Sequence, residues 1–157
     1  MSEEFHEYYK SPSGNIEIVS SDTSIRKCNF VEDNLKTPSK NIPPIMKNAL
    51  EQLKDYFEGK LREFNLQLEL NGTEFQLKVW NELQKIPIGK TITYKELAER
   101  IGNKKAIRAV ANANAKNPIS IIVPCHRVIG SDGKLRGYGG GIKKKKWLID
   151  FEHQSKV

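Results

Sequence analysis

The chain is organised around the stretch Ile119-Ser-Ile-Ile-Val-Pro-Cys-His-Arg-Val-Ile-Gly130. Residues 119–123 are apolar and rich in β-branched side chains, which predicts a short buried strand, although so short a run also fits the start of a helix. Pro124 ends any strand pairing because it has no N–H group. The triplet Cys-His-Arg at 125–127 therefore follows where we expect the strand to meet a turn.

Cys125 is a candidate nucleophile because of its neighbours. Positive charge on a nearby imidazole or guanidinium lowers the pKa of a cysteine thiol, and the thiolate is the form that attacks electrophiles. A free cysteine more often packs as a small apolar side chain. The sequence Pro124-Cys-His-Arg127 directly after an apolar run favours the reactive interpretation. It leaves open which group the thiolate attacks.

Three helices are expected in series upstream of this stretch. The patterns Thr73-Glu-Phe-Gln76 and Thr93-Tyr-Lys-Glu96 are capping boxes, and each predicts the start of a helix. A third helix is expected over residues 104 to about 115, because Asn117-Pro118 stops it. The second and third helices are joined by a short turn with Gly102, so together they form a helix-turn-helix pattern.

The third helix is expected to present a polar face. Lys104, Arg108 and Asn112 recur every four residues and therefore share one side, while Ile107, Val110 and Ala111 are expected on the opposite side. Alternating alanines, Ala109 among them, keep this helix slim, so that a groove or a backbone could approach it closely.

Charge is distributed unevenly along the chain. Residues 74–157 contain 17 Lys and Arg against 7 Asp and Glu, a net charge of +10, whereas residues 1–73 contain 9 against 12, a net charge of −3. This asymmetry indicates that the basic half binds a polyanion. A lysine-rich surface that only meets solvent is the alternative.

The first half offers no catalytic constellation and is interpreted as a structural support. Residues 8–10 and 16–19 predict a hairpin with a longer loop. Pro43-Pro44 opens a helix that Gly59 ends. Residues 60–70 are expected to connect the two halves.

The segment after the cysteine contains a glycine-rich loop, a run of lysines and a last helix. Gly137-Tyr-Gly-Gly-Gly141 is either a surface loop or a pocket wall shaped around a flat ligand, since glycine permits close approach of the backbone. The run 143–146 of four lysines is expected in solvent or on phosphates. A last helix is expected to be anchored by apolar side chains and to carry Glu152 in its final turn. The expected anchors are Ile142, Trp147, Leu148 and Phe151.

Composition excludes several classes of protein. Of the 157 residues, 38% are hydrophobic and 29% charged, which is ordinary for a soluble globular protein, and no apolar run approaches the length of a membrane span. The acidic N-terminus resembles no signal or transit peptide, so we expect a cytoplasmic protein, or a nuclear one if the source is eukaryotic. Cys28 and Cys125 predict no disulfide framework, and Cys28, His6 and His153 are too scattered to predict a metal site.

These motifs together resemble the O6-alkylguanine-DNA alkyltransferase family. The resemblance rests on Pro124-Cys-His-Arg-Val128, and on four flanking segments in matching order: Gly89 to Ala98, Arg108 to Pro118, Gly137 to Gly141, and Trp147-Leu148 with Glu152. It implies an α+β fold with two domains. Residues 1–70 would form a small α/β structural domain with short antiparallel strands. Residues 71–157 would form a mostly helical, winged-helix-like domain with the helix-turn-helix.

The resemblance implies DNA repair by direct reversal. The alkyl group of O6-alkylguanine in DNA, with O4-alkylthymine as a candidate second substrate, would pass irreversibly to Cys125 in a single turnover. The base must first flip out of the duplex, because its O6 is not accessible within the stack. The implied activity is that of a methylated-DNA–[protein]-cysteine S-methyltransferase. The implied partner is double-stranded DNA carrying O6-alkylguanine, bound by a monomer without a cofactor, a metal or a membrane.

Roles for individual residues follow from the same resemblance. Cys125 would be the nucleophile, His126 a general base acting through a water molecule, and Glu152 the group that orients the imidazole. Tyr94 would donate a proton or a hydrogen bond to the N3 side of guanine, and Asn117 would order the turn. The base pocket would be lined by Val123, Val128, Tyr138, Gly139 and Gly140. DNA would be contacted by Lys104, Arg108, Ala109, Asn112 and Arg127, with Arg108 as the finger that fills the space of the flipped nucleotide.

Two other functions are compatible with parts of the sequence. A binding-only alkyltransferase-like module would recognise damaged DNA, but that class lacks the cysteine that this chain has at Cys125. A cysteine hydrolase could use Cys125, His126 and Glu152 as a triad and would turn over repeatedly. It would leave the helix-turn-helix and the basic half unexplained. A plain helix-turn-helix regulator would not need Pro-Cys-His-Arg.

Overall fold

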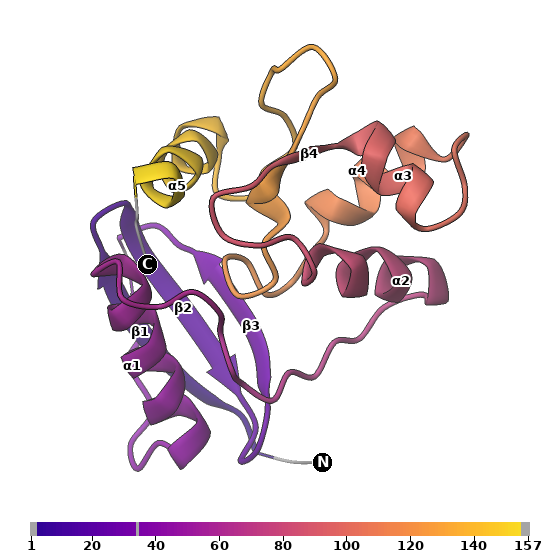
Figure 1. Cartoon of the computed structure of the whole chain (residues 1–157). Coiled ribbons are helices and arrows are strands. Elements are labelled where there is room, and N and C mark those ends of the chain that lie inside the picture. The colour runs from indigo at the N-terminus through magenta and orange to yellow at the C-terminus, as the bar shows by residue number, and fades with distance from the viewer. Residues whose placement is uncertain (1–2, 34, 155–157) are drawn as a thin grey trace.

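The computed structural model describes residues 3–33 and 35–154. Its N-terminal half contains a three-stranded antiparallel sheet formed by β1 (Phe5–Ser11), β2 (Gly14–Ser20) and β3 (Ile25–Phe30), in that order (Figure 1). The predicted hairpin is confirmed, but its loop is short. Ser11 pairs with Gly14, and Gly14 takes a φ of 133°, a conformation open to glycine that lets the chain reverse within two residues.

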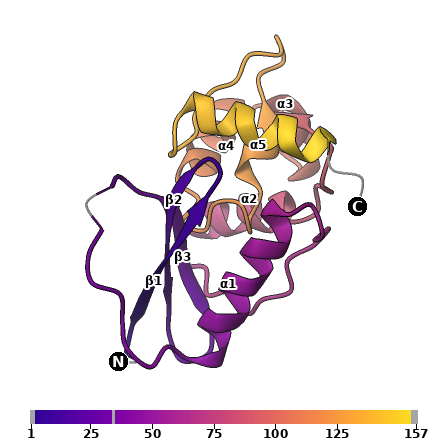
Figure 2. The ribbon, with the colours of Figure 1, turned by 90° about the vertical axis from the view of Figure 1, so that its left-hand side faces the viewer.

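Helix α1 (Pro44–Phe57) packs across one face of this sheet (Figure 2). Pro44 occupies its first turn, and Gly59, with a φ of 76°, follows its end, as the sequence predicted. Its apolar stripe is buried against the β-branched residues of the sheet. The buried residues of α1 are Met46, Ala49, Leu53, Tyr56 and Phe57.

The C-terminal half contains the helices α2 (Glu74–Leu83), α3 (Tyr94–Arg100), α4 (Ile107–Ala115) and α5 (Ile142–Gln154). The two predicted capping boxes both form, one between Thr73 and Gln76 and the other between Thr93 and Glu96. The indole of Trp80 in α2 donates a hydrogen bond to the carbonyl of Ala113 in α4, at 2.8 Å. The fold is therefore α+β, with a sheet domain followed by a helical domain that contains the helix-turn-helix.

Helix α4 begins later than predicted. Lys104 lies in the turn before it, and the helix starts at Ile107, because the chain first closes a turn in which the Ala106 N–H donates to the Asn103 carbonyl at 3.0 Å. Ile107 is also 41% exposed, so it does not belong to the buried side. The residues that α4 buries are Val110, Ala113 and Asn114.

Residues 119–123 are buried but do not form the predicted strand. Ile119 alone makes a β-bridge, and Ile121 takes a φ of 73°, which turns the chain. The Asn117 amide explains this difference, because it binds the backbone groups that a strand would pair. Its Nδ2 donates to the carbonyls of Val123 (2.8 Å) and Ile119 (3.3 Å), and its Oδ1 accepts from the Ile119 N–H at 3.1 Å.

The outer edge of β3 supports two segments from outside the sheet. Cys28 donates its N–H to the Pro118 carbonyl at 3.0 Å and accepts from the Ser120 N–H at 2.7 Å. Ile25 makes the equivalent pair of bonds with residues 67–69 of the connection between the halves. The sheet therefore fixes the segment that leads into Cys125. Among the described residues, no helix has the length and apolar character needed to cross a membrane.

Candidate active site

The carboxylate of Glu152, in the last turn of α5, is the centre of a buried hydrogen-bond cluster. Its Oε2 is 2.6 Å from Nε2 of His126, accepts from the Tyr56 hydroxyl at 2.6 Å, and accepts from Nη2 of Arg127 at 3.0 Å. Its Oε1 accepts from Nε of Arg127 at 2.8 Å. Burial raises the pKa of this carboxyl, but His126 and Arg127 more than offset the effect and hold the pKa well below its ordinary value. Glu152 is therefore ionised.

His126 is fully buried in the single turn η1 (Cys125–Arg127). Burial lowers its pKa below 6.5; Glu152 opposes this shift, while the charges of Arg127 and Lys145 add to it. The imidazole is therefore neutral at pH 7, and its Nε2–H donates to Glu152. The other ring nitrogen, Nδ1, is buried and has no hydrogen-bond partner in the described part of the chain. It is available as a base.

Cys125 is 4% exposed, with its carbonyl held by the amide of Asn114 at 3.2 Å. The sequence predicted a low thiol pKa from the adjacent charges, and this prediction is wrong. Burial raises the pKa of the thiol, and the smaller opposing effects of Asn117 and Lys145 do not reverse the shift. The thiol is therefore protonated at neutral pH, so it needs a base to react.

Arg127 lies inside the protein and not on the predicted DNA surface. It is 7% exposed, its guanidinium binds both oxygens of Glu152, and its Nη1 donates to the Ile86 carbonyl at 2.6 Å. All of these contacts are internal. The physical reason is the buried charge of Glu152, which requires a counter-ion.

The predicted position of Lys145 is also wrong. The sequence placed the run 143–146 in solvent or on phosphates, but Lys145 is fully buried. Its ammonium donates to the Arg136 carbonyl at 2.6 Å and to the Tyr94 hydroxyl at 3.2 Å, and that hydroxyl donates to the same Arg136 carbonyl at 3.0 Å. Burial lowers the pKa of Lys145 from 10.5 to about 8. Its positive charge lowers the pKa of the Cys125 thiol, although burial of the thiol has the larger effect.

The residues predicted to line the base pocket differ in exposure. Val123, Val128 and Tyr138 are buried, and the Tyr138 hydroxyl has no partner among the described side chains and backbone groups. Gly139 is exposed, with open space where a Cβ would lie. A Cβ at Gly140 would come within 2.8 Å of the Phe30 ring, so a side chain there is excluded.

The predicted DNA surface is exposed. Arg108, Ala109 and Asn112 lie on the solvent side of α4, and Lys104 lies in the turn before it.

Ile142, which was expected to anchor α5, is 45% exposed. The buried residues of that helix are Lys145, Leu148 and Glu152.

Three residues of the site were not predicted from the sequence. Asn114 follows buried Val110 by four positions, which puts it on the inner side of α4. Lys145 precedes Glu152 by seven positions and shares its side of α5. Helical spacing could have predicted that both side chains face the interior. Tyr56 is 96 positions from its partner Glu152, and no local pattern signals that contact.

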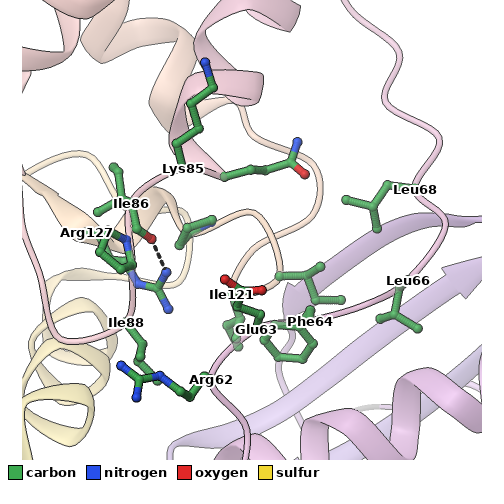
Figure 3. A pocket seen from close by; sticks show the side chains of 14 residues that line it. Arg62, Glu63, Phe64, Leu66, Leu68, Lys85, Ile86, Ile88, Ile121 and Arg127 are labelled. Atoms are coloured by element: carbon green, nitrogen blue, oxygen red, sulfur yellow. Dashed lines mark hydrogen bonds between the residues drawn. The ribbon is translucent and has the colours of Figure 1, made fainter.

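A pocket of about 280 Å³ lies behind the cysteine turn, between the two halves. Figure 3 shows Leu66 and Leu68 of the connection on one side, facing Ile86 and Arg127 on the other. Neither Cys125 nor His126 lines this pocket. It is therefore not where an alkylated base would meet the thiol.

Comparison with known proteins agrees with this geometry. Residues 5–70 match the family model of the ribonuclease-like domain of 6-O-methylguanine DNA methyltransferase, and residues 74–154 match its DNA-binding domain. A methylated-DNA–protein-cysteine methyltransferase of Mycolicibacterium paratuberculosis is 46% identical over 92% of this chain and 89% of that protein. One from Methanosarcina acetivorans is 43% identical over 94% and 97%.

Solved structures show the same similarity. The crystal structure of Mycobacterium tuberculosis O6-methylguanine methyltransferase superposes with a TM-score of 0.89 at 40% identity, covering 99% of this chain and 96% of that one. A crystal structure of the same organism's protein in complex with DNA superposes with a TM-score of 0.87 at 42% identity, covering 96% and 93%.

The buried lysine makes a testable contribution to stability. Because the pKa of Lys145 is about 8 in the folded protein and 10.5 ordinarily, the unfolded chain binds more protons between these values. This group therefore makes the free energy of unfolding rise with pH in that window. We expect Lys145→Met to lose this rise, so that its stability relative to the parent falls between pH 8 and pH 10 in urea denaturation.

Lys146→Met is the matched control, because Lys146 is the next residue in the same run and is exposed. Its stability difference from the parent should stay constant across the same pH range. A constant difference for Lys145→Met as well would contradict a lowered pKa for Lys145.

Proposed function

The chain belongs to the 6-O-methylguanine DNA methyltransferase family, and we propose that Cys125 is the residue that accepts the alkyl group. As a methylated-DNA–protein-cysteine methyltransferase, the protein repairs O6-methylguanine in DNA. The observation that carries the assignment of Cys125 is the state of the adjacent residue, His126. His126 is kept neutral by burial and is hydrogen-bonded through Nε2 to the ionised Glu152, with Nδ1 available, next to a thiol that is protonated until a base acts on it.

The proposed reaction is one displacement at the alkyl carbon. Nδ1 of His126 takes the thiol proton through a water molecule, since neighbouring side chains seldom point the same way. The sulfur then forms a bond to the alkyl carbon as the bond from that carbon to O6 breaks, and the electron pair stays on the guanine. Tyr94 supplies a proton or a hydrogen bond to the N3 side of the base as it gains charge. Glu152 stabilises the imidazolium.

Lys145 supports this reaction through its positive charge. Its ammonium and the thiolate attract one another within a buried site, where charges interact strongly. The same ammonium is bonded to the Tyr94 hydroxyl. We therefore add Lys145 to the residues that stabilise the charged form of Cys125.

Asn117 and the pocket residues hold the reacting groups in place. The Asn117 amide fixes the turn before Cys125 through three backbone contacts. Val123, Val128, Tyr138, Gly139 and Gly140 remain the proposed lining for the flipped base. The exposed backbone at Gly139 leaves space for a flat ring.

The proposed partner is double-stranded DNA carrying O6-alkylguanine. The exposed face of α4 and the net charge of +10 in residues 74–157 support contact with the phosphates and the groove. Arg108, in the first turn of this helix, is the proposed finger that enters the duplex. In this proposal residues 1–70 support the site and residues 71–157 bind DNA and react, as a cytoplasmic monomer.

The two alternative functions, a cysteine hydrolase and a binding-only module, differ from alkyl transfer in what happens to the cysteine. A cysteine hydrolase forms a thioester that water cleaves, whereas displacement at an alkyl carbon leaves a thioether that water does not cleave. A binding-only module takes up no alkyl group at all.

Stoichiometry gives the first test. The protein should take up at most one alkyl group per chain from a duplex with O6-methylguanine, as measured by intact mass, and the group should map to the peptide that contains Cys125. Cys125→Ala should bind the same duplex and gain no mass. Cys28→Ala is the control and should still accept one group, because Cys28 is fully buried in the sheet domain. Repair of many lesions per molecule would refute the proposal.

Base flipping gives the second test. Arg108→Ala should react about 10-fold or more slowly with O6-methylguanine in a duplex, because extruding a base requires a few kcal/mol. Its rate with free O6-benzylguanine should be unchanged, since a free base needs no extrusion.

Lys85→Ala is the control for loss of a single charge. Lys85 is exposed and lies at the pocket between the halves, not on α4. It should change both rates little. Equal losses on the two substrates in Arg108→Ala would contradict the role of a finger.

A further inference from the structure

One hydrogen bond to the central carboxylate comes from the N-terminal half. The Tyr56 hydroxyl, on α1, donates to Oε2 of Glu152 at 2.6 Å. Tyr56 and Glu152 are 1% and 3% exposed, so water does not compete for this bond. The other donors to Glu152, His126 and Arg127, come from the turn η1 in the C-terminal half.

The ring of Tyr56 is fixed by aromatic packing. Its centroid lies 4.9 Å from that of Phe57, 5.5 Å from that of Phe64 and 5.6 Å from that of Phe151. Phe151 directly precedes Glu152. The hydroxyl is therefore delivered to the carboxylate from a packed ring that has few other positions to adopt.

Tyr56 and His126 bind the same carboxylate oxygen. Both are 2.6 Å from Oε2, and Arg127 bridges this oxygen to Oε1. With donors on both sides, the carboxylate cannot rotate without breaking at least one buried hydrogen bond, which is expensive. The hydroxyl, together with Arg127, thus restrains the position of Oε2 and reduces the charge on this oxygen that is available to the imidazole.

We propose that Tyr56 is a positioning residue for alkyl transfer, whose hydroxyl holds the Glu152 carboxylate in the orientation that serves His126. This inference rests on the proposed relay from Glu152 through His126 to Cys125. It gives the N-terminal half a part in the reaction beyond the structural support that its sequence indicates. The sheet domain contributes one donor, from α1, to the group that controls the base.

Electrostatics predicts how loss of the Tyr56 hydroxyl changes the protonation of His126. Burial raises the pKa of Tyr56 well above 10, with a further contribution from Glu152, so the hydroxyl stays protonated and remains a donor. Without it, more of the charge on Oε2 is available to His126, and the imidazolium is stabilised. The other titratable or charged groups that act on this cluster are Arg127, Lys145 and Tyr138. A Tyr56→Phe substitution leaves all three unchanged.

The test is the pH dependence of single-turnover alkyl transfer from a duplex with O6-methylguanine. We expect Tyr56→Phe to react about 10-fold more slowly at neutral pH, less than the 100-fold or more associated with loss of a general base. We also expect the acid limb of its rate profile to move to higher pH, because His126 must lose a proton before it can act. Tyr56→Phe keeps the ring and its packing.

Tyr9→Phe is the matched control. Tyr9 stacks on Phe57 in the same aromatic cluster, at 5.7 Å, and is not among the donors to Glu152. It should keep the rate profile of the parent. A uniform loss of rate in Tyr56→Phe, with no displacement of the acid limb, would mean a purely structural role and would overturn the proposal.

Glu152→Gln separates this proposal from the relay on which it rests. Glu152→Gln should be slow, and adding Tyr56→Phe to it should have little further effect, because Tyr56 acts through the carboxylate. If Glu152→Gln is slow but Tyr56→Phe matches the parent, the role of Tyr56 is wrong and the relay stands. If Glu152→Gln reacts at the parent rate, both are wrong.

Discussion

The site depends on one buried negative charge. The carboxylate of Glu152 is buried, and an unpaired charge there would be strongly destabilising. Three donors from two separate parts of the chain converge on it: Tyr56 from α1, and His126 and Arg127 from the turn that contains the cysteine. Removing one partner of such a pair typically costs about 3–5 kcal/mol. The requirement to satisfy this carboxylate therefore joins α1, α5 and η1.

Burial of the site also sets the chemistry of the thiol. Burial raises the pKa of Cys125 and lowers that of His126, so both groups are neutral at rest. A protonated thiol is a weak nucleophile, and in the proposed reaction it becomes reactive when the imidazole removes its proton beside the alkylated base. The turn that presents it is fixed at both ends, by the Asn117 amide on one side and by the short strand pair of β4 (Ile92–Thr93) with β5 (Val128–Ile129) on the other.

The sequence predicted the two capping boxes and the helices, apart from the start of α4, because those signals are local. It failed where a distant partner decided the outcome. Residues 119–123 have the composition of a strand, but the Asn117 amide captures their backbone groups. Arg127 and Lys145 have the charge of surface residues, but a buried carboxylate and a buried tyrosine hydroxyl draw them inward. The contact of Tyr56 with Glu152 joins positions 96 residues apart and has no signature in either segment.

The protonation state of His126 tests the central claim most directly. Nitrogen-15 NMR of histidine-labelled protein distinguishes the imidazolium from each neutral tautomer, and the chain's other two histidines serve as internal references. At pH 7 we predict a neutral His126 ring with its proton on Nε2, bonded to Glu152, and an unprotonated Nδ1. An imidazolium at pH 7, or a proton on Nδ1, would contradict the claim that the buried carboxylate prepares His126 as the base for Cys125.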